Sequence, residues 1–229
     1  MARAESVHNS CTPTPVLDTG IVVTADTLIL EGIVTTLDAG GTVNVAPMGP
    51  RVDRAVERLV LRPYKTSRTY ENLKRRGCGV FHVVDDVWLV ARAAVGPLEP
   101  PPETFPPKKV QGHVLRDACR WYEFRVRELD DSQERTRIDV EVVARGTLRD
   151  FFGFNRAKHA VVEAAILATR TAFLPRDEIL AEFQRLGVLV EKTGGEQERR
   201  SLVFLQRFVE QTAAGSSPPP AGSATNRPA

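Results

Sequence analysis

The sequence has few of the residues that mark a disulfide scaffold or a metal centre. It contains three cysteines in 229 residues, at positions 11, 78 and 119, which is an odd and widely separated set. Its four histidines show no spacing typical of metal ligands. We therefore expect no disulfide framework and no metal site, and this cysteine usage indicates a reducing compartment, the cytoplasm.

Long apolar runs and a strong net charge are also missing. No stretch approaches the roughly 20 apolar residues of a membrane helix, and residues 1–20 lack the apolar segment of a signal peptide. The net charge of +2 gives no reason to expect general nucleic-acid binding. With 42% hydrophobic and 26% charged residues, the composition is that of an ordinary globular protein with neither a membrane nor a nucleic acid as partner.

Apolar alternation predicts that the first part of the chain is mainly β. The predicted strands are residues 27–37, 42–46, 58–63, 77–84, 87–95, 118–129 and 134–146. A short helix is expected over 67–76, a bulge at Gly32, and a strand end at Pro47, since proline has no N–H to donate. About seven strands with one helix predict an antiparallel barrel over residues 21–153.

After residue 153 the apolar pattern takes the period of helices. Residues 155–174 predict a largely buried helix that Pro175 stops, and two more helices are expected over 177–186 and 196–212. The first helix carries one polar stripe, which is either a solvent edge or the wall of a site: Arg156, His159, Glu163 and Arg170. His159 and Glu163 are four residues apart and can pair. We expect a helical subdomain over residues 154–212.

Three segments predict no regular structure. Residues 1–20 are expected to be a flexible arm, and residues 213–229 a disordered tail. Residues 96–112 hold six of the chain's 16 prolines, and this density predicts an extended crossing loop or a lid.

One stretch, residues 62–73, concentrates groups that bind phosphate. It supplies cations and hydroxyl groups through Arg62, Lys65, Thr66, Ser67, Arg68 and Thr69. A predicted strand precedes it and a predicted helix begins near Ser67 or Thr69. Such a turn brings free backbone N–H groups and the positive end of the helix dipole to the same place as the cations. The alternative is a solvated turn that Ser67 or Thr69 caps.

A second stretch, residues 44–49 (NVAPMG), lies upstream at the end of a predicted hairpin. Beyond Pro47 the backbone is expected to be irregular, so its polar groups are not used in the sheet. Gly49 would permit the close approach of something flat or large. The alternative is a simple turn.

Together these stretches carry a family resemblance. The sequence resembles the flavin-reductase-like group of FMN-binding split β-barrels, and more closely an uncharacterised family of that fold, domain-of-unknown-function family four-four-seven. Four segments match that family in order, over about residues 25–210: 44–49, 62–73, 155–164 and 191–196. The resemblance implies an α+β, mainly β fold: an FMN-binding split β-barrel (a Greek-key antiparallel barrel) with a C-terminal helical subdomain.

The resemblance also implies a cofactor, a partner and a set of site residues. It implies FMN near the interface of a homodimer, with NAD(P)H or another molecule as reductant. The expected cofactor-binding residues are Asn44, Ala46, Pro47, Met48, Gly49, Arg62, Lys65, Thr66, Ser67, Arg68, Thr69 and Asn72. The candidates for reaching a second ligand are Asn155, Arg156 and His159.

Three functions fit these observations. The first is a flavin-dependent oxidoreductase of the flavin-reductase type, for which the family weakly indicates a link to pterin-dependent one-carbon metabolism. The second is a non-catalytic FMN-binding or flavin-sensing protein, and the third is a barrel that binds a phosphorylated pterin or pyridoxal without flavin. The sequence shows no Ser-His-Asp, Cys-His or paired-carboxylate arrangement, so no catalytic residue is predicted. This is compatible with a flavoprotein, because the cofactor carries the redox chemistry.

Overall fold

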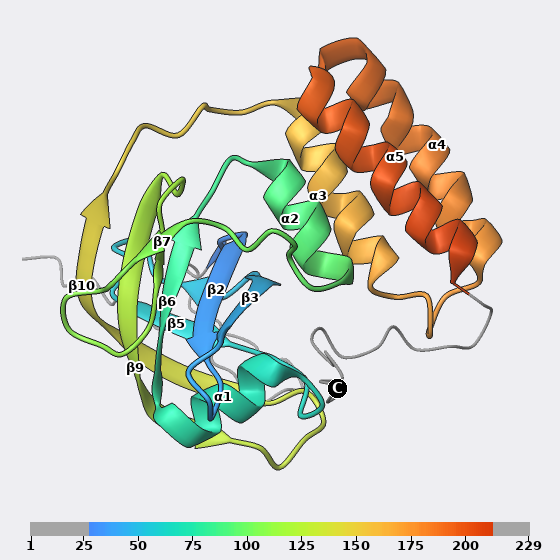
Figure 1. Ribbon diagram of the computed structural model, residues 1–229. Coiled ribbons are helices and arrows are strands. Elements are labelled where there is room, and N and C mark those ends of the chain that lie inside the picture. Colours follow the sequence, from blue (N-terminus) through green and yellow to red (C-terminus); the bar gives the residue numbers. More distant parts are fainter. Residues whose placement is uncertain (1–27, 213–229) are drawn as a thin grey trace, which may run out of the picture.

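A curled antiparallel sheet stands beside a bundle of helices in the computed structural model, which describes residues 28–212 (Figure 1). The strands of the sheet are β1 (Leu28–Ile29), β2 (Gly32–Leu37), β3 (Val43–Met48), β4 (Arg51–Val52), β5 (Arg58–Leu61), β6 (Cys78–Val83), β9 (Arg120–Asp130) and β10 (Arg137–Thr147). Their order is β1-β4-β5-β10-β9-β6-β2-β3, and each neighbouring pair is antiparallel. The predicted antiparallel barrel is confirmed, with β3 at one edge.

Five helices complete the described part of the chain. They are α1 (Arg68–Arg76), α2 (Val87–Val95), α3 (Arg156–Ala168), α4 (Arg176–Thr193) and α5 (Glu196–Gln211). Helix α1 lies against the barrel near the β2–β3 hairpin, and α2 to α5 form a separate layer (Figure 1). The helical C-terminal part is confirmed. No helix among these residues has both the length and the apolar character that crossing a membrane requires.

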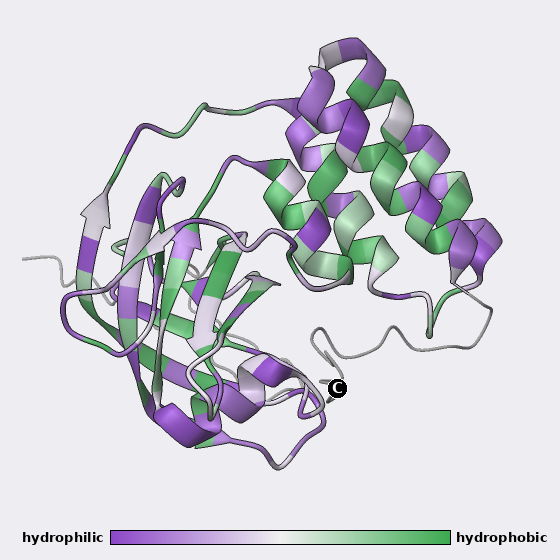
Figure 2. Ribbon diagram, in the orientation of Figure 1, coloured by the Kyte–Doolittle hydropathy of each residue, from purple (hydrophilic) through white to green (hydrophobic). Residues whose placement is uncertain are grey.

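Two hydrophobic cores hold these layers. The barrel core includes the fully buried side chains Leu59, Leu61, Phe81, Phe124 and Ile138. The second core joins α2 to α5 and reaches the sheet through β2. It also includes Leu115 of β8 (Val114–Leu115), which forms a separate two-stranded sheet with β7 (Thr104–Phe105). Hydrophobic residues accordingly lie along β2 and on the facing sides of α2, α3 and α5 (Figure 2).

The strand predicted over residues 87–95 is wrong, because this segment is helix α2. Asp86 caps the helix, with Oδ1 accepting a hydrogen bond of 3.0 Å from the N–H of Leu89. Val87, Val90 and Ala91 are buried at helical spacing. A short apolar run has no alternation to separate a buried strand from a buried helix, and packing against α3 and α5 decides for the helix.

Two predictions about the first hairpin are also wrong. Pro47 does not end its strand but lies within β3 opposite Ile33, which is possible because β3 is an edge strand. Gly32 shows no bulge in its pairing, since β2 begins there in regular register with Met48. Close packing requires glycine at position 32, because a Cβ there would lie 2.2 Å from the carbonyl oxygen of His82.

The predicted ends of two helices differ from the structure. Helix α3 ends at Ala168, six residues before the predicted end, and the hydroxyl of Thr169 donates to the carbonyl of Ile166 at 2.7 Å. The expected burial of its far end is wrong, since Phe173 is 75% exposed. Helix α4 continues through Gly187 to Thr193, because packing against α3 and α5 outweighs the low helix propensity of glycine.

The proline-rich segment, residues 96–112, is fastened to the barrel. The prediction that it has no regular structure is wrong at Thr104–Phe105, which form strand β7. The carboxylate of Glu123 on β9 is fully buried. It accepts hydrogen bonds from the backbone N–H groups of Lys108, Lys109 and Val110 at 2.7, 2.6 and 3.2 Å. Three donors satisfy the buried charge, so this contact anchors the loop to the sheet.

Two further predictions concern the chain termini and the disulfide and metal sites. The predicted arm and tail, residues 1–20 and 213–229, lie outside the described residues, as does Cys11. Within residues 28–212, Cys78 and Cys119 are unbridged, and no three His, Cys, Asp or Glu side chains are arranged to hold a metal ion.

Candidate functional site

A buried cluster of amides and hydroxyls joins the β2–β3 hairpin to α1. The Nδ2 atom of Asn44 donates to Oγ1 of Thr69 at 3.1 Å and to Oγ1 of Thr36 at 3.4 Å. Asn72 Nδ2 donates to the same Thr36 oxygen at 3.0 Å. All four side chains are buried. The structure therefore brings the two predicted stretches together, with Asn44, Thr69 and Asn72 acting as ties between them.

The second stretch has the strand, turn and helix that the sequence predicts. Ser67 is the N-cap of α1, and its Oγ accepts a hydrogen bond of 3.2 Å from the N–H of Tyr70. The first intrahelical bond runs from Glu71 N–H to the carbonyl of Ser67, so the N–H groups of Arg68 and Thr69 precede the helical ladder. Lys65 and Thr66 lie in the turn directly before the cap. The positive end of the helix thus faces the same region as the predicted cations.

Four arginines gather on the outer face of the barrel beside this turn, and we call Arg51, Arg62, Arg135 and Arg137 the arginine cluster. Arg51 pairs across the sheet with Val60, two residues before Arg62, so both side chains leave the same face. Burial, and then the charges of Arg135, Arg51 and Arg137, lower the pKa of Arg62.

The positive charge of the arginine cluster is mostly unmatched. Arg137 has a carboxylate partner, Asp139, with Nε and Nη2 donating at 2.7 and 3.0 Å. Within residues 28–212 no carboxylate pairs with the other three arginines. The Nη1 atom of Arg51 is buried and has no hydrogen-bond partner in the described part of the chain. A buried guanidinium nitrogen without a partner is costly, so this arrangement favours an anion.

Only Arg62 of this cluster is among the predicted site residues. The alternation along its strand could have singled out Arg137, because adjacent strand residues point to opposite faces and Ile138 is buried. Its proximity to Arg62 follows from the pairing of Ile138 with Leu61. That register is a tertiary feature, and no local signal in the sequence marks it.

Glu31, directly before β2, lies against the hairpin end at residues 46–49. A Cβ on Gly49 would lie 2.6 Å from Oε1 of Glu31, so the carboxylate of Glu31 rests against the glycine. Crowding by protein atoms, followed by the charge of Glu163 on α3, raises the pKa of Glu31. The polar stripe of α3 therefore approaches the segment predicted to contact the flavin. Met48 packs against the barrel core.

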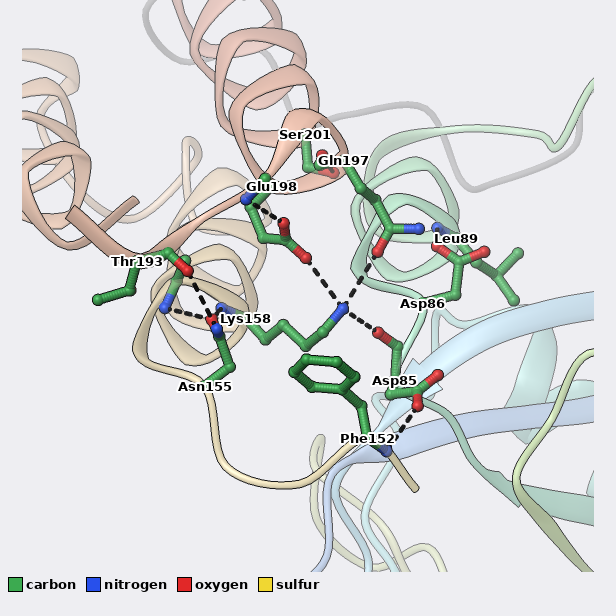
Figure 3. Close-up of polar contacts among 12 residues, drawn as sticks. Asp85, Asp86, Leu89, Phe152, Asn155, Lys158, Thr193, Gln197, Glu198 and Ser201 are labelled. Carbon is green, nitrogen blue, oxygen red and sulfur yellow. Dashed lines mark hydrogen bonds and ion pairs between the residues drawn. The ribbon is translucent and has the colours of Figure 1, made fainter. Parts of the chain in front are cut away.

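The three candidates for a second ligand lie at the start of α3. Asn155 caps the helix: its Oδ1 accepts from the N–H groups of Ala157 and Lys158 at 2.9 and 3.1 Å, and its Nδ2 donates to the carbonyl of Thr193 at 3.0 Å (Figure 3). These bonds give Asn155 a structural task, whereas Arg156 and His159 are exposed.

The predicted pairing of His159 with Glu163 is not made among the described residues. The imidazole instead meets the ring of Phe154 edge to face, with 5.9 Å between the ring centroids. A role of Arg156 or His159 toward a second ligand stays a prediction.

The same region contains a charged contact that sequence reasoning missed, which we call the Lys158 junction. Lys158 Nζ donates to the carbonyl of Asp85, to Oε1 of Gln197 and to Oε1 of Glu198 at 2.8, 3.3 and 2.9 Å (Figure 3). Burial would raise the pKa of Glu198, but hydrogen bonds from Lys158 and from the N–H of Gly195 outweigh it and lower that pKa. The junction joins α3, α5 and the loop after β6.

Models of known protein families match most of this chain. The model described as "Protein of unknown function (DUF447) N-terminal domain" matches residues 30–149, and the model described as "Protein of unknown function (DUF447)" matches residues 155–207. The chain belongs to the DUF447 family. The resemblance read from the four sequence segments is thereby confirmed. Comparison with curated proteins gives no match.

Solved structures resemble this chain to different extents, and one of them shares the fold over most of it. An FMN-bound DUF447 protein from Methanosarcina mazei is 25% identical, with a TM-score of 0.68, and the match covers 79% of this chain and 94% of that chain. The styrene monooxygenase flavin reductase from Pseudomonas putida is 16% identical over 52% of this chain and 80% of its own, with a TM-score of 0.43. An FMN-binding protein from Thermus thermophilus is 14% identical over 62% and 81%, also with a TM-score of 0.43.

Proposed function

We propose that this DUF447 protein binds FMN and acts as a flavin-dependent oxidoreductase of the flavin-reductase type. The observation that carries the proposal is the arginine cluster with its unmatched charge, next to the N-terminus of α1 and the 44–49 hairpin. FMN binding by the M. mazei relative supports the choice of ligand.

The phosphate of FMN fits the groups between β5 and α1. A phosphate monoester carries nearly two negative charges at neutral pH and offers three acceptor oxygens. Arg51 and Arg62 can supply charge and paired N–H donors, and Lys65, Thr66 and Arg68 lie in the following turn at the helix N-terminus. These residues would hold the phosphate and neutralise it.

The flavin ring fits the free edge of the hairpin. Because β3 is the last strand of the sheet within residues 28–212, the outward backbone groups of residues 45–49 have no neighbouring strand to bond in that range. They can serve the polar edge of the isoalloxazine ring. The buried amide cluster of Asn44, Thr69 and Asn72 ties this edge to α1, so ring and phosphate sites are held in one rigid arrangement.

The bound cofactor would supply two-electron redox chemistry, and the chain would bind and orient it. We assign no catalytic side chain. NAD(P)H as reductant and a homodimer with FMN near its interface are part of the proposal. The link between β10 and α3 supports an interface, because Phe152 and Phe154 are 71% and 95% exposed there. Light scattering on the purified chain tests the dimer, and a monomer would remove that part.

The first test is the visible absorbance spectrum of the purified full-length protein, with mass spectrometry of what heat releases. We expect FMN at about one molecule per chain. Anaerobic NADH or NADPH should bleach the flavin bands, and air should restore them, which separates an oxidoreductase from a protein that only stores flavin. A colourless protein that also fails to bind added FMN would overturn the proposal.

A second test separates the phosphate site from the ring site. The double variant R51M/R62M should weaken FMN binding at least tenfold, which corresponds to about 1.4 kcal/mol. Riboflavin lacks the phosphate, so the variant and the wild type should bind it equally. The control is R127M, since Arg127 is a surface arginine that pairs with Glu141 at 3.1 Å on β10. Equal losses for FMN and riboflavin would show that the arginines do not hold the phosphate.

A further inference from the structure

A hollow of about 450 Å³ lies in the helical layer, away from the proposed flavin site. Its lining comes from Trp88 on α2 and from residues on α5 that include Arg199, Arg200, Phe204 and Arg207. None of its lining residues belongs to a strand, to α1 or to the hairpin at 44–49. We call it the α2–α5 groove.

One wall of the groove is aromatic. The rings of Trp88 and Phe204 meet edge to face, with 5.2 Å between their centroids and an interplanar angle of 73°. The guanidinium carbon of Arg200 lies 4.0 Å from the centroid of the Trp88 ring, and that of Arg92 lies 5.7 Å from it. An indole with a guanidinium stacked on it is a flat platform that already combines π-surface with positive charge.

The groove also carries a surplus of positive charge. Three arginines line it against one acid, Glu196. Arg199 has an ion pair outside the groove lining, with 3.5 Å between its Nε and Oε2 of Glu191. Within residues 28–212, Arg200 and Arg207 pair with no carboxylate. Two cations in one hollow therefore lack an anionic partner.

We propose that the α2–α5 groove is a binding site for a planar aromatic anion, meaning a flat ring system with a carboxylate, sulfonate or phosphate group. The ring would stack on the platform of Trp88 and Arg200, and the anionic group would meet Arg207 and Arg199. The hollow has the volume of a small-molecule site, since such sites span about 300–1,000 Å³. A bare anion would leave the aromatic wall uncovered, and a neutral ring would leave the arginines unpaired.

The test uses 2-naphthalenesulfonate as a probe and calorimetry on the full-length protein loaded with FMN. Two matched compounds each lack one feature: 2-naphthalenesulfonamide has the ring without the charge, and inorganic sulfate has the charge without the ring. We expect the probe to bind with a submillimolar Kd, at least tenfold more tightly than either. Equal binding of the sulfonamide would show a nonspecific apolar surface and overturn the proposal, as would no binding of the probe at millimolar concentration.

Variants locate the site. R200A/R207A should weaken probe binding at least tenfold, whereas R185A should not change it, because Arg185 is an exposed arginine on α4 whose partner is Glu182. R200K/R207K keeps both charges and loses the flat guanidinium, so it should also weaken binding, and its thermal melting checks that the helical layer is intact. Unchanged binding in both double variants would overturn the proposal.

We expect this site to be independent of the proposed flavin site, and the same variants test this. R200A/R207A should retain FMN at the wild-type ratio, and R51M/R62M should bind the probe as the wild type does. Displacement of the probe by free FMN at one equivalent would mean that the groove is itself the flavin site, which overturns the assignment of a second ligand class.

Discussion

The Lys158 junction and the arginine cluster both gather positive charge, and both include buried polar atoms. The ammonium group of Lys158 meets three acceptors, including a carboxylate of Glu198, and the ring of Phe152 lies 5.5 Å away (Figure 3). Among the residues that the structure describes, the arginine cluster contains four guanidinium groups and one carboxylate partner, Asp139, and a nitrogen of Arg51 has no acceptor.

This difference separates a structural charge from a ligand-binding one. A buried charge with all its partners in the chain stabilises one arrangement of the helices, and removing one partner leaves the other uncompensated. A buried charge without a partner is unfavourable. An anion that binds to it removes this cost, so the free energy contributes to binding and not to folding. The junction therefore belongs to the fold, and the cluster belongs to the proposed site.

The largest effect is expected from breaking the junction. K158M removes the cation and leaves the carboxylate of Glu198, whose side chain is 9% exposed, without its ion pair. We expect a loss of about 3–5 kcal/mol in the free energy of unfolding. Urea unfolding followed by circular dichroism measures it. The double variant K158M/E198M should recover part of the loss, and a loss below about 1 kcal/mol for K158M would contradict the structural reading of the junction.

A change of pH can also disrupt the hydrogen bonds of a buried group, and His82 on β6 offers this test. The imidazole is fully buried: Nδ1 donates to the carbonyl of Ile33 at 3.2 Å, and Nε2 accepts from the N–H of Leu115 at 3.1 Å. Burial lowers the pKa of His82 to about 4. The unfolded chain, with a histidine pKa of about 6.5, binds the proton first. The stabilising contribution is thus complete above pH of about 6.5 and is lost as pH falls toward 4.

The expected loss from His82 is about 3 kcal/mol of unfolding free energy between neutral pH and pH of about 4. Urea unfolding at a series of pH values measures it. H82Q removes the titrating group, so its stability should depend less on pH over the same interval, although its stability at neutral pH is lower. Parallel pH curves for the two proteins would show that His82 is not the group responsible.

The smallest effect is expected where the charge is unmatched. R62M removes one of four neighbouring cations, so the FMN-free protein should be unchanged or more stable by about 0.5 kcal/mol. Added inorganic phosphate should raise the melting temperature of the wild type more than that of R62M. A loss of several kcal/mol in R62M would show that Arg62 has a structural task like that of Lys158, and the comparison would fail.

Local patterns explain which parts of this molecule could be predicted. Alternation over the long strands, the cap at Ser67 and the change of period after residue 153 all depend on neighbouring residues, and each was confirmed. The apolar run at residues 87–95 was misassigned because its burial in the helical layer, not its local pattern, decides its form. The α2–α5 groove could not be foreseen, since Trp88 and Arg200 are 112 positions apart in the sequence.

By itself the sequence determined the long strands, the turn before α1 with its cations, and membership in a family with an FMN-bound relative. Short-range periodicity and ordered motifs can be recognised without knowledge of the fold. Only the tertiary structure decided which charges have partners. Arg51, Arg62 and Arg137 meet through the register of β4, β5 and β10, and Lys158 meets Glu198 through the packing of α3 against α5. Sequence distance does not reveal which charges pair in space. That pairing separates the charges that hold the fold from those that we propose bind a ligand.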